Sequence, residues 1–181
     1  MNNSPDFVSV YNKFHNKDHF SNGDRAQIRR VTEPSDLETL PAFYKLLENK
    51  LNKNNEKQWQ RVVFFLVKNL KHSESGKEQS GKSVPEENSI NRNKVEHSKK
   101  QAPQKYLSMG AALRQFGIKE ARIFQVKRSE SPNDLIQLRR LVIQAKPKVD
   151  FRKFAERLWY WGENSKKQIL KDYFIAETSE D

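Results

Sequence analysis

The stretch WQRVVFFLVKNL (residues 59–70) decides the fold class, because its apolar residues recur at helical spacing. Trp59, Val62 and Leu66 share one stripe, and further apolar residues such as Phe65 fill the rest of the circumference. A helix that is apolar nearly all round is buried inside its domain. We therefore expect this helix to stand at the centre of the N-terminal part of the chain.

Helical signals continue on both sides of this stretch, and a polar segment separates them. Residues 1–70 and 106–181 carry apolar residues at helical spacing, and no stretch alternates with the period of a strand. Residues 71–105 are rich in Ser, Glu, Lys, Asn, Gln and Gly, and bury too little surface to offset the entropy of ordering. The sequence predicts an all-α protein with two small helical-bundle domains, residues 1–70 and the basic residues 106–181. A flexible polar linker or loop, residues 71–105, joins them.

Start and stop signals divide the second block into helices. Residues 131–134 (SPND) predict a helix start, and Pro147 predicts the end of that helix. Asp150 is placed to cap the next helix, which Gly162 is expected to end. Ser165 is then expected to cap a last helix.

Charge is concentrated in the second block. The chain has 181 residues and a formal net charge of +11. Residues 106–176 hold 15 Lys and Arg against 7 Asp and Glu, a net charge of +8. An excess of this kind favours polyanionic partners, nucleic acid first. We expect the second block to provide the main surface for phosphates.

Several classes of protein are disfavoured. The chain has no cysteine, which fits a cytoplasmic location, and its longest apolar run (residues 62–67) is far too short to span a membrane. His15 and His19 share a helical spacing, but two exposed polar residues are the more common explanation than a metal site. No phosphate-binding glycine loop and no nucleophile elbow is present. We expect no enzyme activity, no catalytic residue, no metal and no cofactor.

Two basic clusters stand on predicted helices. Arg25, Arg29 and Arg30 follow Asp24, the expected cap, and the last two arginines flank the buried side from opposite directions. A solvated helix face and a binding face are both open for this cluster. The same two alternatives are open for the second cluster, which consists of Arg122, Lys127 and Arg128.

Arg139 and Arg140 are expected to differ. With Leu135 as the origin, Arg139 projects about 40° away, toward the apolar side, and Arg140 about 140° away, toward solvent. Arg139 then reads as a partly buried guanidinium paired with a carboxylate of another helix. Arg140 is the better candidate for a phosphate ligand.

Several strings, in this order, resemble the CasB family, the small subunits of the type I-E CRISPR surveillance complex called Cascade. The resemblance covers nearly the whole chain outside the linker and the extreme termini. The strings are AQIRRVTEP (residues 26–34), PAFYKLL (41–47), LSMGAAL (107–113), ARIFQVKR (121–128), QLRRLV (137–142) and VDFRKFAERLWYWG (149–162).

The resemblance implies a non-catalytic subunit in antiviral defence. Such a subunit binds nucleic-acid backbone and stabilises the R-loop of guide RNA and target DNA, including the displaced strand. The implied partners are guide RNA, target DNA, other Cascade subunits and a second copy of itself, with no membrane. A free-standing RNA- or DNA-binding adaptor is the alternative.

The candidate nucleic-acid-binding residues come from three sources. Six arginines match basic positions of the family's strings, Lys45 and Lys127 are added from charge and position, and Arg25 belongs to the first basic cluster. After the WYWG string, Glu163 and Asn164 stand where family members can carry basic residues, and Lys166 and Lys167 are candidate substitutes. The nine candidates are Arg25, Arg29, Arg30, Lys45, Arg122, Lys127, Arg128, Arg139 and Arg140.

Overall fold

A computed structural model describes residues 5–67, 71–72 and 107–176. The described part is built from helices and two very short strands, which confirms the expected all-α class. The first-half elements are α1 (Phe7–His15), α2 (Asn22–Arg30), η1 (Pro34–Thr39), α3 (Pro41–Leu47), η2 (Glu48–Lys50), α4 (Glu56–Phe64) and β1 (Lys71–His72). The second-half elements are α5 (Met109–Gln115), α6 (Glu120–Arg128), α7 (Asn133–Ala145), β2 (Lys148–Val149), α8 (Phe151–Trp159) and α9 (Glu163–Ile175).

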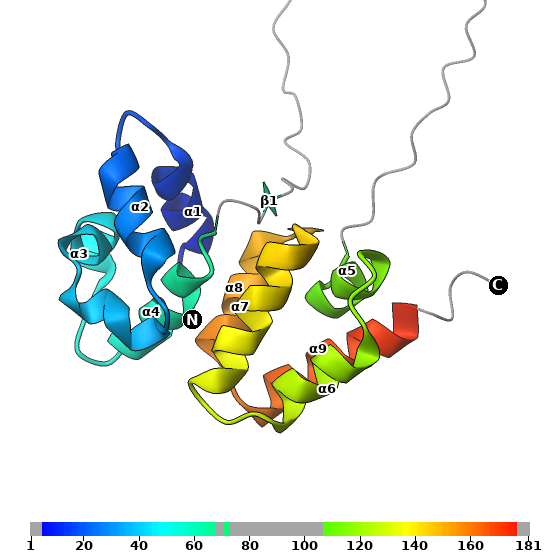
Figure 1. Cartoon of the computed structure of the whole chain (residues 1–181). Helices are drawn as coiled ribbons and strands as arrows, with labels where there is room; N and C mark the ends of the chain where they lie inside the picture. The colour runs from blue at the N-terminus through cyan, green and yellow to red at the C-terminus, as the bar shows by residue number, and fades with distance from the viewer. Residues whose placement is uncertain (1–4, 68–70, 73–106, 177–181) are drawn as a thin grey trace, which may run out of the picture.

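The helices are arranged around α7 and α8. Figure 1 shows α1 to α4 gathered on one side of this pair, and α5, α6 and α9 on the other side. Helix α8 packs against both α1 and α4, whereas α7 packs against α5 and α6. Helices α7 and α8 thus stand between the two groups of helices.

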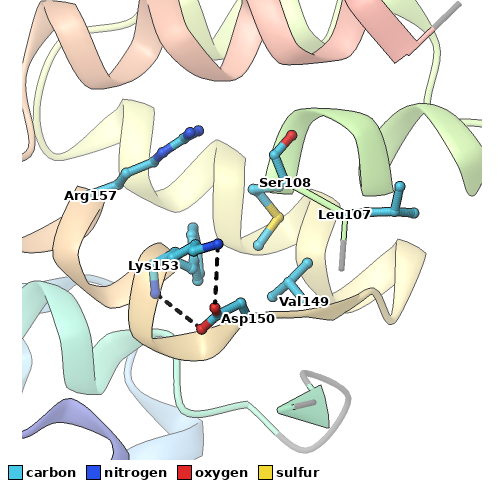
Figure 2. Close-up of a pocket in the computed structure, with 8 residues that line it drawn as sticks. Leu107, Ser108, Val149, Asp150, Lys153 and Arg157 are labelled. Carbon is cyan, nitrogen blue, oxygen red and sulfur yellow. Dashed lines mark hydrogen bonds and ion pairs between the residues drawn. The ribbon is translucent and has the colours of Figure 1, made fainter. Parts of the chain in front are cut away.

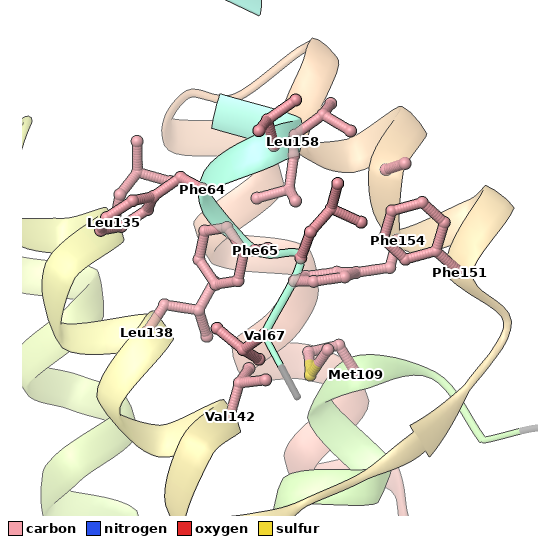
Figure 3. Close-up of a cluster of buried hydrophobic side chains, with 14 of the residues drawn as sticks. Phe64, Phe65, Val67, Met109, Leu135, Leu138, Val142, Phe151, Phe154 and Leu158 are labelled. Carbon is pink, nitrogen blue, oxygen red and sulfur yellow. The ribbon is translucent and has the colours of Figure 1, made fainter. Parts of the chain in front are cut away.

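The apolar run of residues 62–67 enters the core of the second half. Phe64, Phe65 and Val67 lie among side chains of α7 and α8, including Leu138 and Phe154 (Figure 3). Helix α4 ends at Phe64, earlier than the sequence predicted, and the chain continues as a buried turn. The expectation that these residues are buried is confirmed, but they are shared between the two halves.

An aromatic cluster joins α1, α4 and α8. The rings of Phe7, Trp59 and Trp159 meet edge to face, with centroids 5.2–5.7 Å apart. Edge-to-face pairs of this kind are favourable beyond the area that they bury. The division into domains 1–70 and 106–181 stays a prediction, and these rings are in contact across it.

The caps of the second half differ from the expectations at two positions. Helix α7 begins after Pro132, and the Asp150 side chain caps α8 by accepting a hydrogen bond from the Lys153 amide at 3.3 Å, as expected. Gly162, expected to end α8, instead begins α9. Ser165 is not a cap; it lies within α9, and its hydroxyl donates to the carbonyl of Tyr160 at 3.0 Å.

A small parallel sheet forms beside α8. His72 of β1 pairs with Val149 of β2, and Leu107 forms an isolated bridge with the same Val149. Neighbouring strands lie about 4.8 Å apart, so His72 and Leu107 are held about 10 Å from each other. The predicted linker lies almost entirely outside the described residues.

Candidate nucleic-acid interface

Helix α2 carries the first cluster of arginines. Ser21 caps the helix, since its hydroxyl accepts a 3.1 Å hydrogen bond from the Asp24 amide. The expectation that Asp24 is the cap was therefore wrong by three residues; its carboxylate stands in the first turn, where the helix dipole favours a negative charge. Arg25 and Ile28 are both buried, and because they are three residues apart they lie on the same face of α2, toward the core.

Arg25 is buried and used within the protein. Its guanidinium donates to the carbonyl oxygens of Phe14 and His15 at 3.4 and 3.3 Å, and to the Asn22 side chain at 2.7 Å. Phe14 and His15 end α1, where carbonyl groups lack helical partners. Arg25 therefore caps the C-terminus of α1, and its guanidinium is engaged inside the protein.

Arg139, which lies in the other half of the chain, caps the C-terminus of α2. It is 7% exposed, and donates to the carbonyls of Val31 at 2.6 Å and Arg29 at 3.0 Å. Its guanidinium also lies 4.3 Å from the centre of the Phe64 ring. The expected burial of Arg139 is confirmed, but the expected carboxylate partner was wrong, because the acceptors are the carbonyls that end a helix.

Two other cations, Arg61 and Lys166, also donate hydrogen bonds to carbonyls at helix C-termini. Arg61 donates to the carbonyl of Trp159, the last residue of α8, at 3.4 Å. Lys166 donates to the carbonyl of Ser129, which follows α6, at 2.9 Å. Cations are favourable at helix C-termini because the backbone dipoles leave a partial negative charge there. A large share of the buried positive charge is therefore structural.

Arg30 and Arg140 differ from these capping residues, because both are exposed. Arg30 stands between the two residues whose carbonyls Arg139 holds, and Arg140 follows Arg139 in α7. The hydrogen bonds of Arg139 thus bring the C-terminus of α2 against the middle of α7. Exposed guanidinium groups from the two halves of the chain are placed on neighbouring backbone segments.

Arg29 completes this arrangement, which we call the arginine junction (Arg29, Arg30, Arg139 and Arg140). Its guanidinium lies 5.3 Å from the centre of the Phe14 ring, and its buried Nε has no hydrogen-bond acceptor among the described residues. Burial, and then the nearby charge of Arg25, lower the pKa of Arg29. Arg29 is thus a partly buried cation beside the exposed Arg30.

Helix α6 carries the second cluster. Arg122 and Arg128 are exposed, and the Arg128 guanidinium lies 5.7 Å from the centre of the Phe124 ring. Lys127 instead forms a 2.5 Å ion pair with Glu163 at the start of α9. Arg122 and Arg128 are available to an anion, whereas Lys127 would first have to leave its partner.

The remaining candidates are partly or wholly paired. Lys45 forms a 2.7 Å ion pair with Asp24, although its side chain is half exposed. Lys166, the candidate substitute near the WYWG string, is buried, and its ammonium lies 3.5 Å from the Asp134 carboxylate. Lys167 is exposed. Of the two candidate substitutes, Lys167 is therefore the one that can meet a phosphate.

The sequence did not predict two polar residues that are buried in helices, Asp134 and Gln60. Asp134, interpreted only as part of a helix start, is 2% exposed and accepts a 2.9 Å hydrogen bond from the Trp161 indole. Gln60, at 7% exposed, is buried within the apolar stretch of α4. Their only signal in the sequence is a polar residue at an apolar position of the helical repeat.

A small cleft of about 220 Å³ lies beside β2, lined by Asp150, Lys153 and Arg157 (Figure 2). Asp150 lies 3.8 Å from the Lys153 ammonium, and Arg157 forms a 2.7 Å ion pair with Asp172. Each charged group of the cleft thus has an ion-pair partner, and the partner of Arg157 lies outside the cleft. These groups form no arrangement of nucleophile and base.

No helix of residues 5–67 and 107–176 combines the length and the apolar character needed to cross a bilayer. In the same part of the chain, no three His, Asp or Glu side chains gather as ligands for a metal ion.

Comparisons with known proteins agree in sequence and in structure. The family model described as "CRISPR-associated protein Cse2" matches residues 24–174. The "CRISPR system Cascade subunit CasB" of Escherichia coli strain K12 is 33% identical over 175 residues, covering 94% of each chain. A chain in the crystal structure of E. coli Cascade bound to a PAM-containing dsDNA target superposes with a TM-score of 0.74. That chain is 29% identical, and the match covers 97% of this chain and 98% of that one.

Proposed function

The chain belongs to the CRISPR-associated protein Cse2 family, and we propose that it is the small subunit of a type I-E Cascade complex. In this role it binds nucleic-acid backbone without cleaving it. Its partners are guide RNA, target DNA, the other Cascade subunits and a second copy of itself. The related chain whose structure is known comes from Cascade bound to a double-stranded DNA target, which supports this assignment.

The arginine junction is the observation that carries the proposal. Arg30 and Arg140 are exposed, stand on separate helices, and are held together by the buried Arg139. Cations that neutralise phosphates release condensed counterions, which favours binding to any sequence. Guide pairing can then read the sequence while this subunit holds the strand.

Two arginines of α6, Arg122 and Arg128, form a second exposed basic surface, which we call the α6 ridge. Arg122 and Arg128 are exposed and, within the described part of the chain, have no carboxylate partner. We propose that the arginine junction and this ridge together stabilise the opened target, including the displaced strand, in the R-loop.

The test is reconstitution of Cascade from purified subunits and guide RNA, with this chain, without it, and with an Arg30→Ala/Arg140→Ala variant. Permanganate footprinting of the displaced strand reports the lifetime of the R-loop. The lifetime should fall without the subunit and with the variant, while the variant still joins the particle in the stoichiometry of the unmodified chain. An equal lifetime in all three preparations would refute the proposal. A chain that binds nucleic acid but never joins the particle would favour the free-standing adaptor.

A further inference from the structure

A second surface of the protein has the opposite charge. A cleft of about 520 Å³ lies between η1, α4 and the start of α7. Its walls carry Glu33, Glu38 and Glu56, with Pro34 and Leu135 as apolar lining. Clefts of this size commonly hold a ligand group. In a chain with a net charge of +11, this concentration of carboxylates is unusual.

Within the described ranges, these carboxylates have no cationic partner. Among the described residues, none of the three forms an ion pair; Glu33 accepts from the Ser35 hydroxyl at 2.6 Å and Glu56 from the Tyr44 hydroxyl at 3.2 Å. Two cations also line the cleft. Of these, Arg61 donates to the carbonyl that ends α8, whereas Lys57 is exposed and has no ion-pair partner among the described residues.

Gln60 gives a second and independent sign of a ligand. Its side chain lines the cleft and is 7% exposed. No group in the described ranges donates to or accepts from its amide. Among the described residues, the amide therefore has N–H and C=O groups without a protein partner, which an occupant of the cleft would engage.

We propose that this cleft binds an arginine-bearing segment of a neighbouring protein subunit, a proposal that rests on the assembly into Cascade proposed above. A guanidinium offers five N–H donors in a planar fork, which suits the Gln60 carbonyl together with the carboxylates of Glu38 and Glu56. The prolines and Leu135 accept the apolar stem of the side chain. Phosphates are repelled by the same carboxylates, so the cleft separates a protein-binding face from the nucleic-acid face.

Photo-crosslinking in the reconstituted particle tests the occupant. Benzoylphenylalanine is placed at Ser35, an exposed residue at the rim, and crosslinked products are sequenced by mass spectrometry. We expect a crosslink to an arginine-containing peptide of a protein subunit. Gln60→Leu and Glu38→Gln/Glu56→Gln should each reduce its yield at least tenfold, whereas Glu120→Gln on α6 should leave it unchanged. A crosslink to RNA or DNA, no crosslink, or an unchanged yield in the cleft variants would overturn the proposal.

A measurement on the isolated full chain separates this proposal from the assembly itself. The acetylated and amidated peptide Gly-Arg-Gly-Arg-Gly is titrated against the protein, and the side-chain amide resonances of Gln60 are followed by NMR. These resonances should shift with the arginine peptide and stay in place with its citrulline counterpart. Gln60→Leu should keep the melting temperature of the parent, since the amide has no partner to lose. If the chain joins no particle but shows these shifts, only the proposed function is contradicted. If the shifts are absent, or equal for both peptides, the proposed binding of arginine in the cleft is contradicted.

Discussion

Arg139 caps α2 from a position 108 residues further along the chain: its Nη1 donates a 2.6 Å hydrogen bond to the carbonyl oxygen of Val31. A second donor reaches the carbonyl of Arg29 at 3.0 Å. The backbone of the two halves is thus joined by one buried side chain whose charge suits the end of a helix. This contact determines which arginines are structural and which can meet a ligand.

Arg139→Ala is expected to lower the free energy of unfolding by about 1–3 kcal/mol, because two buried carbonyls lose their donors. Urea denaturation at neutral pH measures the change. Arg140→Ala is the matched control, and should stay within about 0.5 kcal/mol of the parent because its side chain is exposed. Equal midpoints for Arg139→Ala and the parent would contradict the capping role.

Arg30→Ala/Arg140→Ala should weaken binding of the isolated chain to DNA and reduce its dependence on salt. The slope of log Kobs against log salt should become shallower by about 0.7–0.9 for each lost phosphate contact. Fluorescence anisotropy between 50 and 200 mM salt, about the range in which such contacts are lost, measures it. Lys53→Ala, at an exposed lysine before α4, is the control for charge alone. If Lys53→Ala changes the slope as much as Arg30→Ala/Arg140→Ala does, the two arginines do not form a defined phosphate-binding site.

Gly110→Ala should destabilise the fold, because α5 lies against α9 at this residue. An added Cβ would stand 2.6 Å from the Tyr173 amide nitrogen and closer still to the Ile169 carbonyl oxygen. Overpacking of this kind costs about 1–3 kcal/mol, and backbone atoms yield less than side chains. Gly23→Ala, whose Cβ would meet only the Ser21 oxygen at 3.7 Å, should not destabilise α2. Thermal unfolding of both variants tests the pair.

The ion pairs of Glu163 should make part of the stability of the fold depend on pH. Hydrogen bonds from Lys127 and Lys166 lower the pKa of Glu163 to about 2. Because the folded pKa lies below the unfolded value of 4.5, the stabilisation is present above pH 4.5 and lost as the pH falls toward 2. The melting temperature of Glu163→Gln should therefore lie below that of the parent at pH 7, and the difference should vanish near pH 2. A difference independent of pH would rule out this ion-pair contribution.

Replacement of residues 75–104 by a six-residue Gly-Ser linker should leave the melting temperature of the fold unchanged. His72 and Leu107 pair with the same residue, Val149, and are therefore about 10 Å apart. Six residues span up to about 20 Å, so the short linker closes the gap without strain. A large loss of stability would show that the replaced segment contributes to the core.

Local signals in the sequence predicted much of the fold. The helical spacing around Leu135 and Leu138 predicted α7 and its buried face, and Asp150 was identified as the cap of α8. These features depend on residues within one or two turns of each other, so the chain carries them without reference to distant contacts. The errors at Gly162 and Ser165 arose at helix ends, where several residues can serve as a boundary.

The sequence by itself determined a basic helical protein, its family resemblance and the inward direction of Arg139. Only the tertiary structure decided that Arg25 and Arg139 end other helices while Arg30 and Arg140 stay exposed. The reason is physical: a guanidinium and the carbonyls of a helix end can meet from any separation in sequence, and helical spacing gives the direction of a side chain but not what lies there.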